Sequence, residues 1–146
     1  MTEALLARLQ RLEDLQAIQE LFNEYASYLD RGQFDRYAAL FCRDGEVKLG
    51  PLGRAEGREN IAALMTKNLA AGVGESYHII SNPLIKLEGD RATAEVMWTV
   101  ILRGEKDRPV IGMIGQHKDE LRREEGQWRF QSRAGFVDIP GRMPTQ

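Results

Sequence analysis

Two histidines are the side chains of this sequence best suited to moving a proton. His78 stands in the stretch YHIISN, and His117 stands in the stretch GQHKD. Histidine accepts and returns a proton near neutral pH without a large change in its pKa. A lone histidine in a strand is more often a hydrogen-bonded structural residue than a catalytic one. For both residues the catalytic and the structural interpretation therefore stay open at this point.

Asp30 is a second candidate, because it is expected to end a long helix. A carboxylate at that position faces the negative end of the helix dipole, which is mildly unfavourable. Such a placement requires either a nearby cation or a role in a site. A surface ion pair with Arg31 or Arg36 is the simpler hypothesis, and a functional role is the alternative.

Arg133 is the third polar candidate. On the last predicted strand it alternates away from Trp128 and Phe130, which favours a solvated face. An arginine there is also suited to pair with a carboxylate or to hold an anionic leaving group. The single cysteine, Cys42, excludes an internal disulfide and a multi-thiolate metal site. The histidines lack metal-ligand spacing and no glycine-rich phosphate loop occurs, so neither a metal nor a cofactor is expected.

The composition predicts one ordinary domain spanning residues 1–146. Lys and Arg total 20 against 22 Asp and Glu, a formal net charge of −2. This balance does not attract a polyanion, so nucleic acid is not an expected partner. Charges run through the first sixteen residues, MTEALLARLQRLEDLQ, and leave no apolar stretch of signal or membrane length. No membrane partner is expected, and the expected location is the cytoplasm.

The elements that must position these side chains begin with helices. A long helix is predicted from about Glu3 to Asp30, with Gly32 ending it. Its apolar stripe comprises Leu12, Leu15, Ile18, Phe22, Tyr25 and Leu29, at helical spacing. The predictions that follow are a short helix with Phe34, Tyr37, Leu40 and Phe41 on one side, a strand Glu46 to Leu49, and a helix Glu59 to Ala71.

The second half of the chain changes to a period of two. Four strands are predicted: Tyr77 to Glu88, Arg91 to Arg103, Val110 to Arg123 and Gln127 to Val137. Helices that precede an antiparallel meander are typical of an α+β domain. The alternation of a dinucleotide-binding fold is absent.

The order of these motifs resembles the SnoaL-like branch of the NTF2-like (cystatin-like) superfamily. The motifs are IQELF at 18–22, YLDRGQFD at 28–35, LF at 40–41, DGEV at 44–47, YHIISN at 77–82 and LRREEGQWRF at 121–130. The resemblance covers nearly the whole chain. It implies a cone in which three N-terminal helices pack on a curved, mostly antiparallel sheet.

Within that superfamily the chain resembles scytalone dehydratase and hexachlorocyclohexane dehydrochlorinase. The resemblance implies that His78 is a general base oriented by Asp30, and that Arg133 matches an arginine that assists a departing halide. His117 falls where the dehydratase lines its pocket with asparagine. The chain departs from the dehydratase at Leu29, where that enzyme has tyrosine. It departs again at 100–102, which lack its second histidine, so the same substrate is not expected.

The resemblance therefore implies a cofactor-free lyase or isomerase acting on a small apolar molecule, with cyclic and aromatic compounds among the candidates. The expected pocket is lined by Tyr25, Tyr28, Phe41, Trp98, Met113 and His117. The alternatives are a small-molecule-binding module and an assembly module like the small subunit of ring-hydroxylating dioxygenases. Apolar residues on the open sheet face predict a homodimer or homotrimer.

Overall fold

The computed structural model describes residues 2–141, so residue 1 and residues 142–146 of the predicted domain lie outside the described residues. The helices are α1 (Glu3–Asp30), α2 (Phe34–Ala39) and α3 (Arg58–Leu69). The strands are β1 (Phe41–Lys48), β2 (Arg54–Glu56), β3 (Ser76–Glu88), β4 (Arg91–Arg103), β5 (Pro109–Glu124) and β6 (Gln127–Ile139). The predicted α+β class, with helices first and the meander second, is confirmed.

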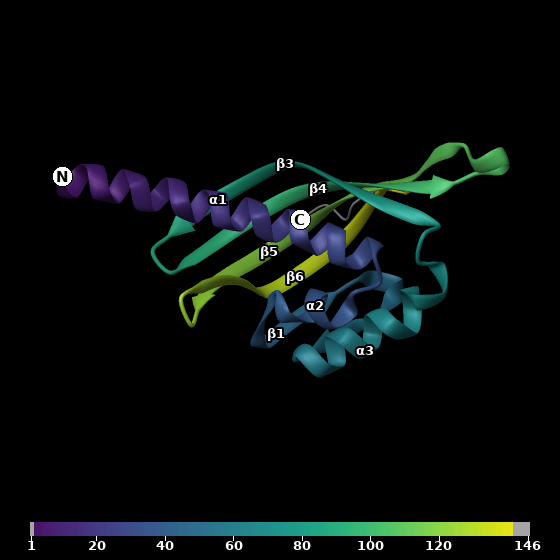
Figure 1. Ribbon diagram of the computed structural model, residues 1–146, viewed down its shortest axis with the longest axis horizontal. Coiled ribbons are helices and arrows are strands. Elements are labelled where there is room, and N and C mark those ends of the chain that lie inside the picture. The colour runs from purple at the N-terminus through teal and green to yellow at the C-terminus, as the bar shows by residue number, and fades with distance from the viewer. Residues whose placement is uncertain (1, 142–146) are drawn as a thin grey trace.

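The six strands form one sheet in the order β2-β1-β6-β5-β4-β3. Every pairing is antiparallel except that of β1 with β6, which is parallel. Helix α1 runs across the sheet, while α2 and α3 lie beside β1 (Figure 1). The core of the protein lies between the helices and the inner face of the sheet, and it includes Phe22 and Tyr25 of α1 and Phe130 of β6.

The first strand begins earlier than the sequence predicts. Phe41 was expected on the second helix with Leu40, but it opens β1 and pairs with Phe130 of β6. Its ring is fully buried, and its centroid lies 5.3 Å from that of Phe130. The periodicity of a six-residue helix cannot reveal this pairing, because the partner strand lies almost ninety positions later in the chain.

Helix α1 begins and ends where its local signals indicate. The hydroxyl of Thr2 accepts a hydrogen bond from the backbone N–H of Leu5 at 3.2 Å, which caps the first turn. At the other end Gly32 adopts φ +71° and ends the helix. The helix N-terminus extends past the strands (Figure 1). Leu12 is therefore 63% exposed, and the predicted apolar stripe begins in practice at Ile18.

The outer face of the sheet, opposite α1, is divided along its length. A row here is the set of residues that lie side by side on adjacent strands. At one end two neighbouring rows are mostly apolar. One contains Tyr77, Ile101 and Ile111, and the other contains Ile79, Thr99, Ile114 and Ile139. Ile79, Ile111 and Ile139 are each more than half exposed. Rows nearer the other end are charged. Among the described residues, no helix is long and apolar enough to span a membrane.

Candidate functional site

His78 and Asp30 are in direct contact although they lie 48 positions apart in the chain. Nδ1 of His78 lies 2.6 Å from Oδ1 of Asp30. The backbone N–H of His78 also donates to Oδ2 of the same carboxylate at 3.0 Å and to Oδ1 at 3.2 Å. An ionised carboxylate can only accept, so Nδ1 carries the proton and Nε2 is the free base. The partner of Asp30 is thus His78, not the surface arginines at 31 and 36.

Helix α1 and strand β3 position this pair. Asp30 is the last residue of α1, and His78 is the third residue of β3. The backbone contact of His78 fixes the carboxylate, so the imidazole meets an acceptor whose orientation is already set. The histidine side chain is 19% exposed and the aspartate side chain 12%. The pair is shielded from bulk water but remains within reach of a ligand.

The inner face of the sheet places the other polar candidates in successive rows beyond His78. His78 lies in a row with Val100 and Met113, and the next row contains Trp98 and Gly115. His117 and Gly135 share a third row, followed by the cross-strand pair of Asp119 and Arg133. At the His78 end the inner face is uncovered, since Met113, Leu102, Val110 and Val137 are between 36% and 48% exposed.

Arg133 points into the core, contrary to the alternation expected from the sequence. The register of β5 with β6 shifts between Glu120 and Leu121, because Glu120 faces Ser132 while Leu121 faces Phe130. Gln131 is the extra residue of this bulge, and it brings Phe130 and Arg133 to the same face. Of the two alternatives for Arg133, the solvated face is therefore wrong, and pairing with a carboxylate is the one that the structure shows.

A carboxylate compensates the buried charge of Arg133. Nε and one terminal nitrogen of Arg133 donate to the two oxygens of Asp119 at 2.7 and 3.0 Å, and both side chains are fully buried. The guanidinium also stacks on Tyr25 and Phe130, 4.2 and 4.3 Å from their ring centroids. The remaining terminal nitrogen, Nη1, has no hydrogen-bond partner among the described residues. Arg133 is thus held rigidly, and its Nη1 remains available to donate a hydrogen bond to another group.

His117 and Trp98 provide two more buried polar atoms without partners in the described chain, Nδ1 of the imidazole and Nε1 of the indole. Their ring centroids lie 6.0 Å apart. Gly115 makes room for the indole ring, since a Cβ there would lie 2.2 Å from Cζ2 of Trp98. A Cβ on Gly135 would lie 3.5 Å from Cδ2 of His117, an ordinary contact distance. Burial, followed by repulsion from the charge of Arg133 and from His78 when that ring is protonated, lowers the pKa of His117 well below 6.5.

The pKa of His117 predicts a loss of stability in mild acid. Because this pKa is lower in the folded protein than in the unfolded chain, the unfolded chain binds more protons below pH 6.5. The contribution of His117 to the free energy of unfolding is fully present above pH 6.5. It falls by up to about 1.4 kcal/mol per pH unit as the pH decreases below that value. Urea unfolding of the wild type and His117→Phe between pH 7.5 and 5 measures it. A wild-type slope equal to that of the variant contradicts the prediction.

The remaining predicted pocket residues fall into three groups. Tyr25 lies in the core, where its hydroxyl accepts a hydrogen bond from Tyr37 at 2.8 Å and burial raises its pKa. Phe41 lies deeper, in the aromatic core with Phe130. Tyr28 is half-buried against the core, and Met113 lies at the uncovered end of the inner face. The structure brings Tyr25, Trp98 and His117 together and does not place Phe41 in contact with His78.

Two buried carboxylates are not among the residues that the sequence singles out. Asp119 shares the parity of His117 and could have been recognised as an inner-face residue from that spacing. Asp14 of α1 is buried and accepts a hydrogen bond from Nε1 of Trp128 at 3.0 Å and another from Arg123 at 2.9 Å. These contacts tie α1 to the last two strands, so the role of Asp14 is structural.

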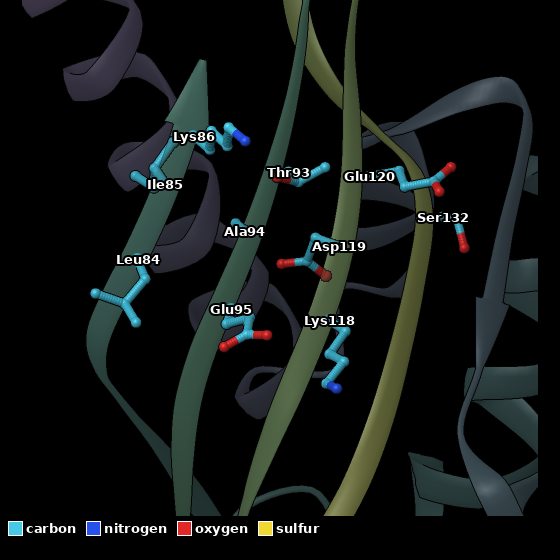
Figure 2. Close-up of a pocket in the computed structure, with 10 residues that line it drawn as sticks. All are labelled: Leu84, Ile85, Lys86, Thr93, Ala94, Glu95, Lys118, Asp119, Glu120 and Ser132. Carbon is cyan, nitrogen blue, oxygen red and sulfur yellow. The ribbon is translucent and has the colours of Figure 1, made fainter. Parts of the chain in front are cut away.

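Two hollows of the surface lie away from the pair of His78 and Asp30. The first hollow has a volume of about 530 Å³ and lies on the outer face of the sheet. Leu84, Glu95 and Lys118 are among the residues that line it, and α1 lies behind the strands in this view (Figure 2). The other, of about 510 Å³, lies between α1 and the turn that joins β5 to β6. Neither contains His78. Within residues 2–141, no cluster of three potential metal ligands is present.

Comparison with known proteins agrees with this architecture. The SnoaL-like domain family matches residues 10–134. An NTF2-like protein with a cystatin-like fold from Novosphingobium aromaticivorans has 27% identity and a TM-score of 0.85, covering 94% of this chain and 90% of that one. A putative scytalone dehydratase from the same organism has 26% identity and a TM-score of 0.75, with 93% and 91% covered. LinA has the same fold at 21% identity, with a TM-score of 0.79 and 95% and 99% covered.

Proposed function

Because the chain belongs to the SnoaL-like domain family, whose structural neighbours include enzymes, we propose that it is a cofactor-free lyase or isomerase of small molecules. The observation that carries the proposal is the 2.6 Å contact between His78 and Asp30. Oriented by a carboxylate, an imidazole with one free nitrogen is the arrangement that general-base catalysis requires.

The reaction begins with transfer of a proton from carbon to Nε2 of His78. The carbon is one acidified by a neighbouring carbonyl, and the electron pair of the broken C–H bond moves toward the carbonyl oxygen. Asp30 retains the Nδ1 proton and stabilises the imidazolium that forms. In an isomerase the proton returns to a different carbon. In a lyase the electron pair forms a double bond as hydroxide leaves, and the imidazolium protonates the hydroxide to water.

The neighbouring groups support a compact, largely apolar substrate. Val100 and Met113 share the row of His78, and Trp98 lies in the next row. Polar groups on the inner-face rows beyond His78 are few and buried, and a small-molecule site usually has a few polar groups among apolar walls. The putative scytalone dehydratase is similar over most of its length, which supports elimination of water as one form of the reaction.

Exchange of carbon-bound hydrogen tests the proposal without knowledge of the natural substrate. We expect the wild-type protein to accelerate deuterium incorporation next to the carbonyl of 2-tetralone, a compact cyclic ketone, in D₂O. Proton NMR of the ketone measures the rate, with buffer alone as the reference. Binding of the ketone without any acceleration would contradict the enzymatic proposal and favour the small-molecule-binding module.

We also propose that two copies of the chain associate through the apolar rows of the outer face, which include Ile79, Ile111 and Ile139. A monomer rarely exposes a contiguous apolar patch of this kind. Two rows away, beyond the row of Met97 and Gln116, Glu95 lies directly beside Lys118, so a two-fold rotation that pairs these rows brings opposite charges of the two copies together. Such self-complementarity is what a two-fold interface needs, and it makes a homodimer the proposed assembly.

Analytical ultracentrifugation tests the proposed homodimer. We expect the wild type to sediment as a dimer and the double variant Ile79→Lys, Ile111→Lys to sediment as a monomer, because two buried lysines would lack partners. Leu12→Lys on α1 is the matched control, since Leu12 is also 63% exposed but lies on a different element. A monomeric wild type, a trimer, or a double variant that remains dimeric would each contradict the proposed interface.

A further inference from the structure

The buried end of the inner face contains three polar atoms that need a partner. These are Nη1 of Arg133, Nδ1 of His117 and Nε1 of Trp98, each on a side chain more than nine-tenths buried. Leaving a buried polar atom unpaired destabilises the folded protein, because the atom loses its hydration without gaining a hydrogen bond. Three of them on consecutive rows of one face therefore indicate a place where a ligand completes the hydrogen bonds.

The side chains are close to one another. The ring of Tyr25 lies 5.4 Å from the ring of His117 and 4.2 Å from the centre of the Arg133 guanidinium. The ring of Trp98 lies 6.0 Å from that of His117. Two of the three free atoms, in Arg133 and Trp98, can only donate. The group they suit is an oxygen acceptor surrounded by aromatic walls.

The charges at this place cancel. Asp119 accepts two hydrogen bonds from Arg133 and neutralises it, and the Asp119 side chain is fully buried. Burial also lowers the pKa of His117, which keeps that ring neutral at pH 7. An anionic ligand group would lose its hydration without gaining a net positive charge in return. An uncharged carbonyl oxygen loses far less hydration and still receives the donors.

We infer that Asp119 is a specificity-determining residue that acts by cancelling the charge of Arg133. The free nitrogens of Arg133, His117 and Trp98 then form a subsite for an uncharged carbonyl oxygen. Carboxylates are excluded from this subsite because it has no net positive charge. Asp119 does not touch the ligand and acts through Arg133, whose geometry and charge it sets. The inference rests on the proposed function only in assuming that this face binds the substrate. It narrows the substrate to neutral carbonyl compounds and excludes acids of the same shape.

The two tryptophans provide an internal probe and its control. Nε1 of Trp98 is unpaired, whereas Nε1 of Trp128 already donates to Asp14 at 3.0 Å. In a ¹H–¹⁵N NMR spectrum we expect acetophenone to move the Trp98 indole signal and leave that of Trp128 in place. Benzoate, which has the same ring and a charged carboxylate, should bind at least tenfold more weakly. Equal or tighter binding of benzoate at Trp98, or no response to either probe, would overturn the inference.

The variant Asp119→Asn should reverse this preference, because Arg133 then carries an uncompensated charge. We expect the affinity ratio of acetophenone to benzoate to fall by tenfold or more, a change that a merely structural role of Asp119 would not produce. If this variant does not fold, the double variant Asp119→Asn, Arg133→Gln removes both charges and should retain the preference for acetophenone. A double variant that prefers benzoate would contradict the inference.

These results are distinguishable from failure of the proposed function. If acetophenone binds at Trp98 and 2-tetralone shows no exchange, the subsite is present and the lyase or isomerase proposal fails. If exchange depends on His78 while benzoate is the better ligand, the catalytic proposal holds and the role of Asp119 fails.

Discussion

Replacing His78 by alanine is expected to lower the rate of deuterium incorporation into 2-tetralone by about 10²–10⁴-fold, the usual contribution of a general base. Asp30→Asn should lower it by a comparable factor. The asparagine amide can no longer hold the imidazole in the tautomer with its proton on Nδ1, the atom now 2.6 Å from Oδ1 of Asp30. The NMR exchange assay measures both rates under identical conditions.

Two controls separate loss of chemistry from loss of structure. Asp35→Asn changes an exposed carboxylate on α2 and should leave the exchange rate unchanged. The Trp98 indole signal should respond to acetophenone in His78→Ala as in the wild type, because Trp98 lies in a different row from His78. ¹⁵N shifts of His78 should report the change of tautomer in Asp30→Asn. Full exchange activity in His78→Ala or in Asp30→Asn would refute the mechanism.

Breaking the pair of Arg133 and Asp119 is expected to have the largest effect on stability. Asp119→Asn should reduce the free energy of unfolding by about 3–5 kcal/mol, because it leaves a buried guanidinium without its counter-charge. For a chain of this size that corresponds to a decrease in Tm of roughly 10 °C or more. Thermal unfolding followed by circular dichroism at pH 7 measures it.

A matched pair of controls distinguishes burial from charge alone. Glu125→Gln removes a partner of Arg43 in an exposed ion pair and should change the unfolding free energy by less than about 1 kcal/mol. The double variant Asp119→Leu, Arg133→Met replaces both buried charges by apolar groups and should recover most of the stability lost in Asp119→Asn. A loss below about 1 kcal/mol in Asp119→Asn would be inconsistent with the buried pair.

Much of the fold was predictable because its signals are local. The first helix ends at Asp30 as expected, since Gly32 supplies the positive φ that ends it. Strand β4 has the predicted bounds Arg91–Arg103, because its alternation is uninterrupted and both neighbouring strands pair with it. Where the pairing partner is remote, as for Phe41 on β1, local periodicity did not predict the element.

The candidate site, like the fold, was predictable from the sequence only in part. Residue types and the family resemblance identified His78, Asp30, His117 and Arg133 without coordinates. They did not show that Arg133 faces inward, because a bulge at Gln131 reverses the alternation and depends on how β6 pairs with β5. Asp119 was missed for a related reason, since its importance comes entirely from the arginine opposite.

By itself, then, the sequence determined the order of helices and strands, the end of α1 at Asp30, and the small set of side chains able to carry the chemistry. The elements depend on residues within a few positions of one another, and the side chains on residue types and on the order of motifs along the chain. Only the tertiary structure decided that Asp30 contacts His78 across 48 positions and that Asp119 neutralises Arg133. Both contacts join different elements, and their geometry is set by packing and strand register, which local periodicity does not encode.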